Sequence, residues 1–407
     1  MWSKIRNILC SISVEPVFVF YMLCFSTYYV VLQNLMIEKA CTVNLNETEI
    51  VCNNLEDPVN VEIQNEVQKL VTNIKMYSSF CSTIPAFIFV SFLGPLSDSL
   101  GRRTPMILPF LGHVVIAGLL NLNVYCSWWP IEATLLESIW GFFGGGFATV
   151  SSLGYSYISD VSSAGNVMAR ISILDGLKML SEPAGTYLSG ILFNKFGQPL
   201  GYYIVFTTSG IFALLGVLYV IFFLKESVVS NTKTTQVPLC SALKSKNPLS
   251  LVKVVGRPRQ GLKRMMIVWS FCILTIHYLH DRSSLYLYTR KKFGWSEEQY
   301  TIYSSLDSLH SFSRAIIVTP FLSKVLNLHD PMIGMMGALS WVTYFAVTGL
   351  ATQGWMMYLA TGLSSIGGLT STPIIALLCK LVEKDETGAL MAGTSGKWLS
   401  SHTLQEK

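Results

Sequence analysis

The chain has 407 residues, of which 51% are hydrophobic and 13% are charged, and its mean hydropathy is +0.46. Soluble domains carry about 25% charged residues, so this composition excludes an ordinary soluble protein and indicates a membrane protein. The net charge of +5 would also suit a nucleic-acid partner, but the charge lies in loops predicted to be cytoplasmic, where the bias of membrane insertion accounts for it. We therefore expect no nucleic-acid partner.

Apolar windows of about 19 to 22 residues predict about ten membrane-spanning helices. We interpret the first as a retained helix, because its apolar run is too long for the core of a signal peptide and no small-residue cleavage site follows it. The predicted spans are 14–35, 76–97, 105–124, 134–158, 172–194, 202–224, 265–285, 300–322, 332–350 and 355–379.

Two loops of opposite charge predict the orientation. Nine basic residues and one acid lie in the loop 225–264, whereas seven acids and two lysines lie in the loop 36–74. Because cytoplasmic loops are enriched in lysine and arginine, the first loop is predicted outside and the basic loop inside. An even number of spans then places both chain ends in the cytoplasm.

The predicted exofacial loop 36–74 carries two candidate modification sites. Asn46-Glu47-Thr48 is a glycosylation acceptor pattern, which has meaning only on the lumenal side. Cys41 and Cys52 share the loop, and an oxidising compartment would allow them to pair. The pairing is a hypothesis at this point.

The spans fall into two halves, as in transporters built from repeats. We predict a six-helix bundle over 1–224, a basic cytoplasmic linker over 225–264, a partial bundle of four helices over 265–379 and a cytoplasmic tail over 380–407. The stretches LSDSLGRRTPM and LSKVLNLHDPM follow the second span of each half and coincide at Leu, Ser, Leu, Pro and Met. A complete repeat would have six spans in the second half, so about two helices are expected to be missing.

The stretch GPLSDSLGRR, residues 94–103, directly follows the second span. Gly101 permits a sharp turn, and Gly94 lets another helix approach closely. Arg102 and Arg103 favour the cytoplasmic face.

Asp98 is the most informative residue of this stretch. A carboxylate at a helix end can accept hydrogen bonds from the N-terminus of a neighbouring helix, and such a contact can form in one conformation and break in another. The alternative is a solvated turn that only sets the topology.

Residues 94–103 resemble the loop signature of the major facilitator superfamily, G-x-L-x-D-x-x-G-R-R/K, at its expected place between the second and third helices. More narrowly, the chain resembles the proton-coupled folate transporter and heme carrier family, solute carrier family 46, over roughly residues 14 to 390. The motifs that carry the narrower resemblance are Val14-Glu15-Pro16, Ser97-Asp98-Ser99, Asp160-Val161-Ser162-Ser163 and Glu386-Thr387-Gly388-Ala389-Leu390.

The resemblance implies an all-α polytopic membrane fold of twelve helices in two pseudo-repeat halves that works by alternating access. With about ten helices, the chain is expected to be truncated at its C-terminus relative to the family. In the superfamily the signature acid faces the eleventh helix, so Asp98 is expected to have lost its gating partner. Asp160 and Arg170 are assigned to the same gating motif.

Ionisable residues repeat at i, i+3 and i+7 in two predicted spans, so that each set lies on one helical face. A charge near the bilayer centre costs about 2.5 to 3.5 kcal/mol on insertion scales, so each is a functional candidate. We expect both sets to line the substrate path, whereas the alternative is that each set neutralises itself and only holds helices together. The two sets are Asp175, Lys178 and Glu182 in the fifth span, and Asp307, His310 and Arg314 in the eighth.

Proton coupling needs a group that titrates near ambient pH. Burial favours the neutral form of an acid, and histidine titrates near about 6.5, so Asp175 and His277 are the candidates. The family resemblance implies proton coupling at both positions. This chain departs from the family in two ways here. The family acid is typically glutamate rather than aspartate, and Lys178, one turn away, opposes protonation of Asp175.

Other chemistries have weaker support. The spacing of His277, His280 and Asp281 would suit a metal, but Asp281 is rotated off the face of His277 and no fourth ligand is evident, so we expect no metal. His113 is expected to be a hydrogen-bonded packing residue. The sequence has no Ser/His/Asp arrangement and no glycine-rich phosphate loop, so we expect no enzyme.

The sequence therefore predicts a proton-coupled symporter of a small organic solute, folate-like or another organic anion or catabolite, in the plasma membrane or a lysosomal or endosomal membrane. The solute, protons and the lipid bilayer are the expected partners, with the proton as coupling ion and no other cofactor, and the oligomeric state stays open. One observation argues against an anionic solute. Folate carriers of the family have a basic residue a few positions after this proline, whereas only apolar residues directly follow Pro373 here. The alternative is a non-transporting truncated protein that acts by binding a full-length partner.

Overall fold

Helices build both halves of the chain, and no strand occurs among the residues described. The computed structural model describes residues 13–55, 57–140, 144–163, 166–227, 256–258, 261–278, 285, 288–289, 292–295, 297–318, 321–322, 326, 328–364, 371–383, 386–388 and 390–391.

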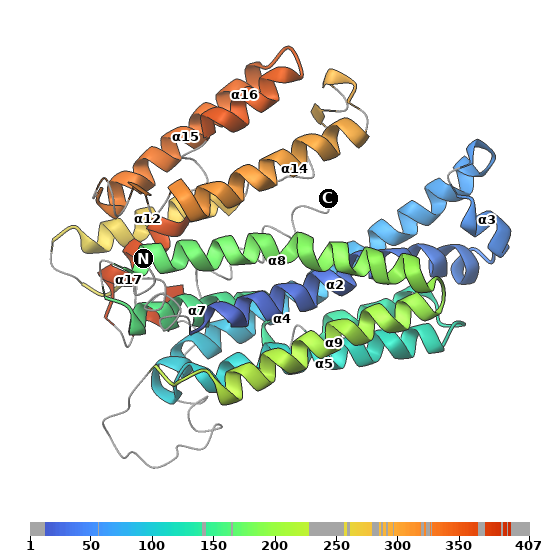
Figure 1. Ribbon diagram of the computed structural model, residues 1–407, viewed down its shortest axis with the longest axis horizontal. Helices are drawn as coiled ribbons and strands as arrows, with labels where there is room; N and C mark the ends of the chain where they lie inside the picture. Colours follow the sequence, from blue (N-terminus) through green and yellow to red (C-terminus); the bar gives the residue numbers. More distant parts are fainter. Residues whose placement is uncertain are drawn as a thin grey trace.

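The N-terminal half consists of long helices that run back and forth along one axis (Figure 1): α2 (Glu15–Lys39), α4 (Val61–Leu100), α5 (Arg103–Tyr125), the 3-10 helix η3 (Ile131–Trp140), α7 (Gly146–Val161), α8 (Val167–Phe196) and α9 (Leu200–Phe222). Helix α2 packs against α8 and α9, and α5 packs against α9. Three short elements follow α2: the π-helix η1 (Ala40–Asn44), α3 (Glu49–Asn53) and η2 (Pro58–Asn60).

The C-terminal half contains fewer and shorter described helices: α12 (Lys263–Tyr278), α14 (Glu297–Ser313), the π-helix η4 (Arg314–Val318), α15 (Asp330–Leu350), α16 (Trp355–Leu363) and α17 (Ser371–Leu381). Every predicted span overlaps at least one described helix, and 355–379 covers parts of both α16 and α17. The all-helical prediction is therefore confirmed. Five described segments are long and apolar enough to cross a membrane: Glu15–Asn44, Val61–Asp98, Arg103–Tyr125, Leu200–Phe222 and Met332–Leu350.

The first predicted loop is largely helical, which differs from the expectation of a loop over 36–74. Helix α2 continues to Lys39 and α4 begins at Val61. At 1.5 Å per residue, the 40 residues of α4 extend about 60 Å, which is about twice the hydrocarbon thickness of a bilayer. Hydropathy marks only the part of a helix that lies in lipid, so the polar end of α4 escaped prediction.

The fourth predicted span, 134–158, is not one continuous helix. It divides into η3 and α7, and Gly145 and Gly146, at the start of α7, have φ angles of 61° and 53°. These left-handed values interrupt a right-handed helix and cost glycine little, because it has no Cβ. A Cβ at Gly144 would lie 2.7 Å from the Cα of Pro109, so this glycine also allows the close approach of α5.

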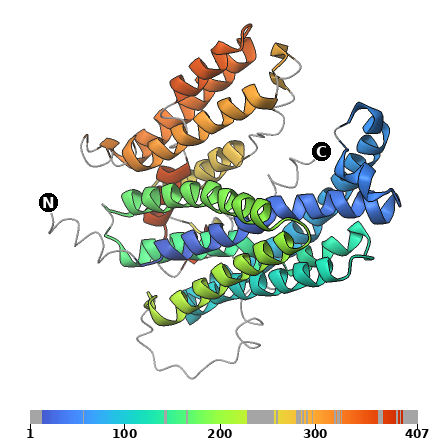
Figure 2. The ribbon, with the colours of Figure 1, turned by 45° about the vertical axis from the view of Figure 1, so that its right-hand side comes forward.

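The two ends of the bundle differ. We call the end that carries Gly101 and Glu226 the linker end, and the end that carries the Cys41–Cys52 disulfide the disulfide end. In Figures 1 and 2 the two halves lie together at the linker end, where α7 and α17 meet, and their ribbons diverge towards the disulfide end. Helix α8 forms the seam, since it packs against α14, η4 and α17 of the other half.

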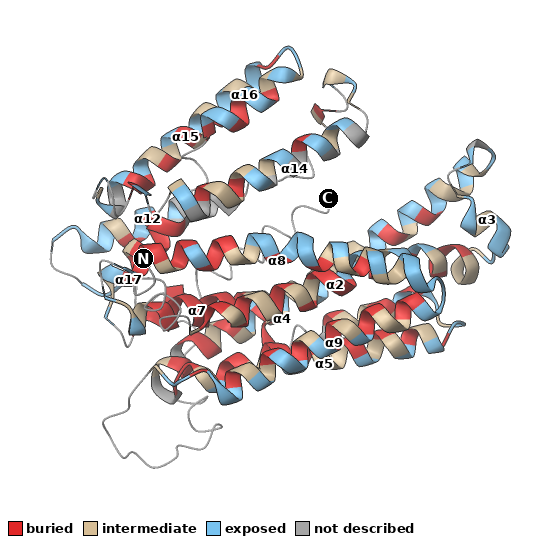
Figure 3. Cartoon of the chain, viewed as in Figure 1, coloured by how far each residue is buried: buried red, intermediate tan, exposed pale blue. Residues whose placement is uncertain are grey.

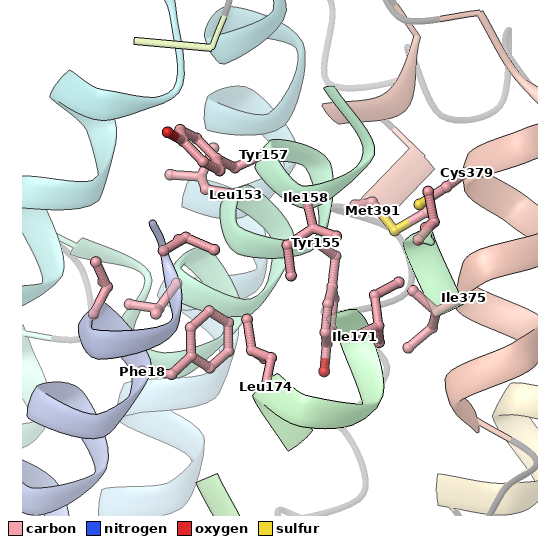
Figure 4. Close-up of a cluster of buried hydrophobic side chains, with 14 of the residues drawn as sticks. Phe18, Leu153, Tyr155, Tyr157, Ile158, Ile171, Leu174, Ile375, Cys379 and Met391 are labelled. Carbon is pink, nitrogen blue, oxygen red and sulfur yellow. The ribbon is translucent and has the colours of Figure 1, made fainter. Parts of the chain in front are cut away.

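The buried core is concentrated where α2, α7 and α8 meet, as the red segments of Figure 3 show. Figure 4 shows its centre: Phe18 of α2 lies beside Leu174, and a Cβ at Gly154 would collide with the Phe18 ring. The same cluster includes Ile375 and Cys379 of α17. Apolar packing near the linker end therefore continues across the seam and holds the halves together there.

Candidate transport site and linker-end gate

Asp175 of α8 is the most central of the predicted site residues, and it is 7% exposed. Its Oδ1 accepts a hydrogen bond of 2.8 Å from the Tyr155 hydroxyl of α7, and its Oδ2 accepts one of 3.1 Å from Thr372 Oγ1 of α17. The Nζ of Lys178 lies 3.6 Å from Oδ1. Because Tyr155 and Thr372 belong to different halves, this one carboxylate joins the halves.

The surroundings of Asp175 stabilise a charge that burial would otherwise penalise. A buried carboxylate keeps its charge only where hydrogen-bond donors and a cation compensate its lost hydration. Tyr155, Thr372 and Lys178 supply these groups, and the Lys178 ammonium also lies 5.3 Å from the centre of the Phe147 ring. The structure thus contains the Asp175–Lys178 ion pair that the alternative interpretation expects. It also contains the contact of Asp175 with Thr372 across the seam.

The other residues of the two predicted sets of ionisable side chains differ in their burial. Glu182 is exposed, Asp307 and His310 are half-buried, and Arg314 is 7% exposed. Arg314 donates through Nη1 to the Ser364 carbonyl at 3.0 Å and through Nη2 to Ser311 Oγ at 2.5 Å. The second set lies in α14 and η4, and both elements pack against α8, the helix that carries the first set.

Arg102 is the centre of the linker-end gate, and its side chain is completely buried. Its Nη1 lies 2.6 Å from Asp98 Oδ1, and its Nε donates to Asp160 Oδ2 at 3.0 Å. Ser97 Oγ accepts a further bond from Nη1 at 2.6 Å. One guanidinium thus joins the end of α4 to the end of α7, as a planar group with five donors can do and a lysine ammonium cannot.

Glu226 completes the α4–α5 turn, and the sequence had not singled it out. Its carboxylate accepts backbone hydrogen bonds from Arg102 at 2.7 Å and from Arg103 at 3.1 Å. Arg103 in turn donates to the carbonyls of Val220 and Ile221 in α9. Gly101 has a φ of 101°, and a Cβ there would collide with the Glu226 carboxylate, so this glycine is required for both the turn and the contact.

The expectation that Asp98 has lost its gating partner is wrong. Its Oδ1 accepts a hydrogen bond of 2.9 Å from the backbone N–H of Gly388, in the segment that follows α17. A Cβ at Gly388 would collide with the Gly94 carbonyl and lie 2.6 Å from Asp98 Oδ1. The segment that follows α17 therefore supplies a partner for Asp98, and the backbones of Gly94 and Gly388 lie close together there.

Arg170, which was assigned to the gate, holds the start of α2. Its Nη2 lies 2.7 Å from Glu15 Oε1 and donates to Ser13 Oγ at 2.9 Å, while Nη1 donates to Ser162 Oγ at 3.2 Å. Arg170 therefore ties α8 to the first helix and to the end of α7 within the N-terminal half.

Several predictions concern residues about which the structure says little. The side chain of His277 and the whole of His280 and Asp281 lie outside the described residues. The His113 ring packs against Tyr21 with ring centres 4.8 Å apart, but its Nδ1 makes no hydrogen bond within the described part of the chain. His113 is thus a packing residue without the expected hydrogen bond at this atom.

Glu137 of η3 is a carboxylate in a predicted span that the sequence analysis missed. Its Oε2 is buried and makes no hydrogen bond to the residues described. A count of acids in the fourth span would have found it. The described part of the chain contains no group of three His, Cys, Asp or Glu side chains that could hold a metal ion.

Residues 17–396 match the Major Facilitator Superfamily. The chain belongs to this family. It is therefore a multi-pass membrane transporter of the major facilitator fold and not an enzyme.

Similar curated proteins belong to solute carrier family 46. The "Probable peptidoglycan muropeptide transporter SLC46" of Drosophila melanogaster is 23% identical over 406 residues, which cover 93% of this chain and 75% of the relative. The "Lysosomal proton-coupled steroid conjugate and bile acid symporter SLC46A3" of Gallus gallus is 24% identical over 393 residues, which cover 93% of this chain and 82% of the relative.

Solved structures of transporters have the same fold. The human organic anion transporter MFSD10 (TETRAN) superposes with a TM-score of 0.70 at 17% identity, over 97% of this chain and 90% of that one. The proton:xylose symporter XylE superposes with a TM-score of 0.62 at 14% identity, over 96% and 86%. At these identities the likeness shows the fold alone.

Proposed function

We propose that the protein is a proton-coupled symporter of a small organic solute and that Asp175 binds the coupling proton. The observation that carries this proposal is the position of the carboxylate, which accepts one hydrogen bond from each half of the transporter. A titratable group at that point changes the strength of the contact between the halves whenever it gains or loses a proton. His277 remains a second candidate on the family resemblance.

Proton binding would act on three interactions at once. The neutral acid attracts the Lys178 ammonium less strongly, and it is a weaker acceptor for Tyr155 and Thr372 than the carboxylate is. Because Thr372 is in α17, loss of its bond loosens the seam on the side of the linker end. Protonation would therefore favour separation of the halves at the linker end, and deprotonation would favour their closure.

The proposed solute is an organic anion or a comparable small molecule. Lys178 and Arg314 are two cationic groups on elements that meet at the seam, which supports a path that tolerates negative charge. The relatives named above carry a muropeptide or steroid conjugates and bile acids according to their names. Chemically, these compounds share carboxylate or sulfate groups on a larger body.

We propose that the linker end faces the cytoplasm and the disulfide end faces the outside or the organelle lumen. The acidic first loop and the basic linker support this orientation, as does the disulfide, because disulfides persist in oxidising compartments. A plasma membrane at an acidic surface and a lysosomal or endosomal membrane would both supply a proton gradient in the required direction. Both locations stay in the proposal.

Uptake by proteoliposomes tests the proposal. The full chain is reconstituted and given a radiolabelled bile acid, a steroid sulfate or a muropeptide, with and without an imposed pH gradient. We expect uptake that the gradient stimulates and that a protonophore abolishes. Uptake that is insensitive to both would contradict proton coupling, and no uptake together with co-purification of a full-length relative would favour the non-transporting alternative.

A further inference from the structure

A basic cavity lies at the linker end of the C-terminal half, outside the proton site and the Asp98–Arg102 gate. Its volume is about 370 Å³. Three cations, one acid and three apolar side chains line it: Arg257, Lys263, Lys380, Glu383, Pro258, Leu381 and Val382.

The elements around the cavity favour an anion. Lys263 begins α12, so the positive end of that helix dipole faces the same region, and Lys380 lies in the last turn of α17. The backbone N–H groups at a helix N-terminus and clustered lysine and arginine side chains are both typical of phosphate binding. The volume falls within the range of about 300 to 1,000 Å³ that is common for ligand sites.

The outer surface of α12 continues the cavity as an apolar strip. Leu262 and Met265 are 65% and 50% exposed, and Trp269, four residues further along the helix, is 62% exposed. The spacing of three and four residues places these side chains on one helical face. An amphiphile with a phosphate group and hydrocarbon chains therefore fits the site, with the phosphate at the cations and the chains along this strip.

The cavity is also connected to the gate. Arg257 forms an ion pair with Glu386 and lies 4.0 Å from Glu383. Glu386 precedes by two residues the Gly388 whose N–H donates to Asp98. The cation that lines the cavity thus holds the same short segment that closes the linker end.

We propose that this cavity binds the phosphate-bearing headgroup of an anionic phospholipid and that the bound phosphate competes with Glu386 for Arg257. Release of Glu386 loosens the segment around Gly388 and favours the open linker end. This inference rests on the cytoplasmic placement of the linker end proposed above, because anionic lipids are concentrated in the cytoplasmic leaflet. It does not depend on the identity of the solute.

Lipid binding is measured on the full chain in nanodiscs of phosphatidylcholine, with and without phosphatidylinositol 4,5-bisphosphate, by native mass spectrometry. The Lys263→Gln/Lys380→Gln double variant is expected to bind this lipid about tenfold more weakly or worse. Lys195→Gln, an exposed lysine near the disulfide end, is the matched control and should bind as the wild type does. Equal binding by all three proteins would overturn the site.

The effect on the gate is measured by maleimide labelling of the native Cys379, which is 7% exposed and lies beside Ser159 of α7 at the seam. The lipid should raise the labelling rate several-fold in the wild type and leave the double variant unchanged. Arg257→Gln should label fast without lipid, because the ion pair between Arg257 and Glu386 is already absent. An unchanged rate in the wild type would overturn the coupling to the gate.

Inorganic phosphate and soluble inositol trisphosphate separate a headgroup from a free anion. If either accelerates labelling as strongly as the lipid at the same concentration, the assignment to a lipid is wrong. Because binding and labelling need no transported solute, failure of uptake leaves this inference intact, and failure of lipid binding leaves the proposed symport intact.

Discussion

The backbone N–H of Gly388 donates a hydrogen bond of 2.9 Å to the Asp98 carboxylate, although the two residues are 290 positions apart in the chain. Asp98 also lies 2.6 Å from the buried Arg102 guanidinium, which in turn reaches Asp160. The linker end is therefore closed by an ionic network of the N-terminal half and one backbone donor of the C-terminal half.

Gly388→Ala should open the linker end. The added Cβ would collide with the Gly94 carbonyl, which is backbone and cannot rotate away, and it would lie 2.6 Å from Asp98 Oδ1. We expect Cys379 labelling to accelerate several-fold and uptake to fall about tenfold. Gly118→Ala is the control, because a Cβ there has no neighbour within 4 Å; labelling at the wild-type rate in Gly388→Ala would show that the contact does not close the gate.

Arg102→Lys should destabilise the protein although the charge is kept. A lysine ammonium cannot bond Asp98 and Asp160 in the planar geometry of the guanidinium, so one buried carboxylate loses its cationic partner, at a cost of up to about 3 to 5 kcal/mol. We expect a clearly lower melting temperature in detergent. Arg264→Lys, at an exposed arginine, should melt as the wild type does, and equal melting of both variants would contradict the role of Arg102.

Thr372→Val and Tyr155→Phe distinguish the two hydrogen bonds to Asp175. Thr372 donates across the seam, whereas Tyr155 donates within the N-terminal half. We therefore expect Thr372→Val to accelerate Cys379 labelling and Tyr155→Phe to leave it near the wild-type rate. The same rate change in both variants would argue against a seam that depends on the Thr372 bond.

Asn46 is predicted to carry an N-linked glycan, which Asn46→Gln should remove. Asn46 is exposed, adopts a left-handed φ of 55° and lies between Cys41 and Cys52, which form a disulfide with a Cα–Cα distance of 5.8 Å. We expect the wild type from mammalian cells to shift on a gel after glycosidase treatment, and the variant to run at the deglycosylated position without it. No shift of the wild type would argue against a lumenal disulfide end.

The sequence predicted several of the charged residues of the site, although it missed Glu137 and Glu226. Asp175 and Arg102 were found because an ionisable side chain is costly in lipid and because the loop signature has a specific spacing. Thr372 and Gly388 escaped because one is a neutral side chain and the other a backbone donor. Their roles depend on contacts over 197 and 290 positions, which no local pattern encodes.

The fold, like the site, was predicted in part from the sequence. Apolar windows located every helix of the bundle, since the hydrocarbon core sets their length. They missed the polar end of α4 and the break at Gly145, because hydropathy measures the solvent preference of side chains and contains no information on backbone dihedral angles.

Gradient-driven uptake by Asp175→Asn tests the central claim most directly. Asparagine has nearly the same shape and keeps one carbonyl oxygen that can accept a hydrogen bond from Tyr155 or Thr372, but its amide nitrogen replaces the second acceptor and the side chain cannot bind the proton. We predict that this variant loses stimulation by the pH gradient and keeps solute exchange without a gradient, while Glu182→Gln on the same helix behaves as the wild type. Full gradient stimulation in Asp175→Asn would contradict the account.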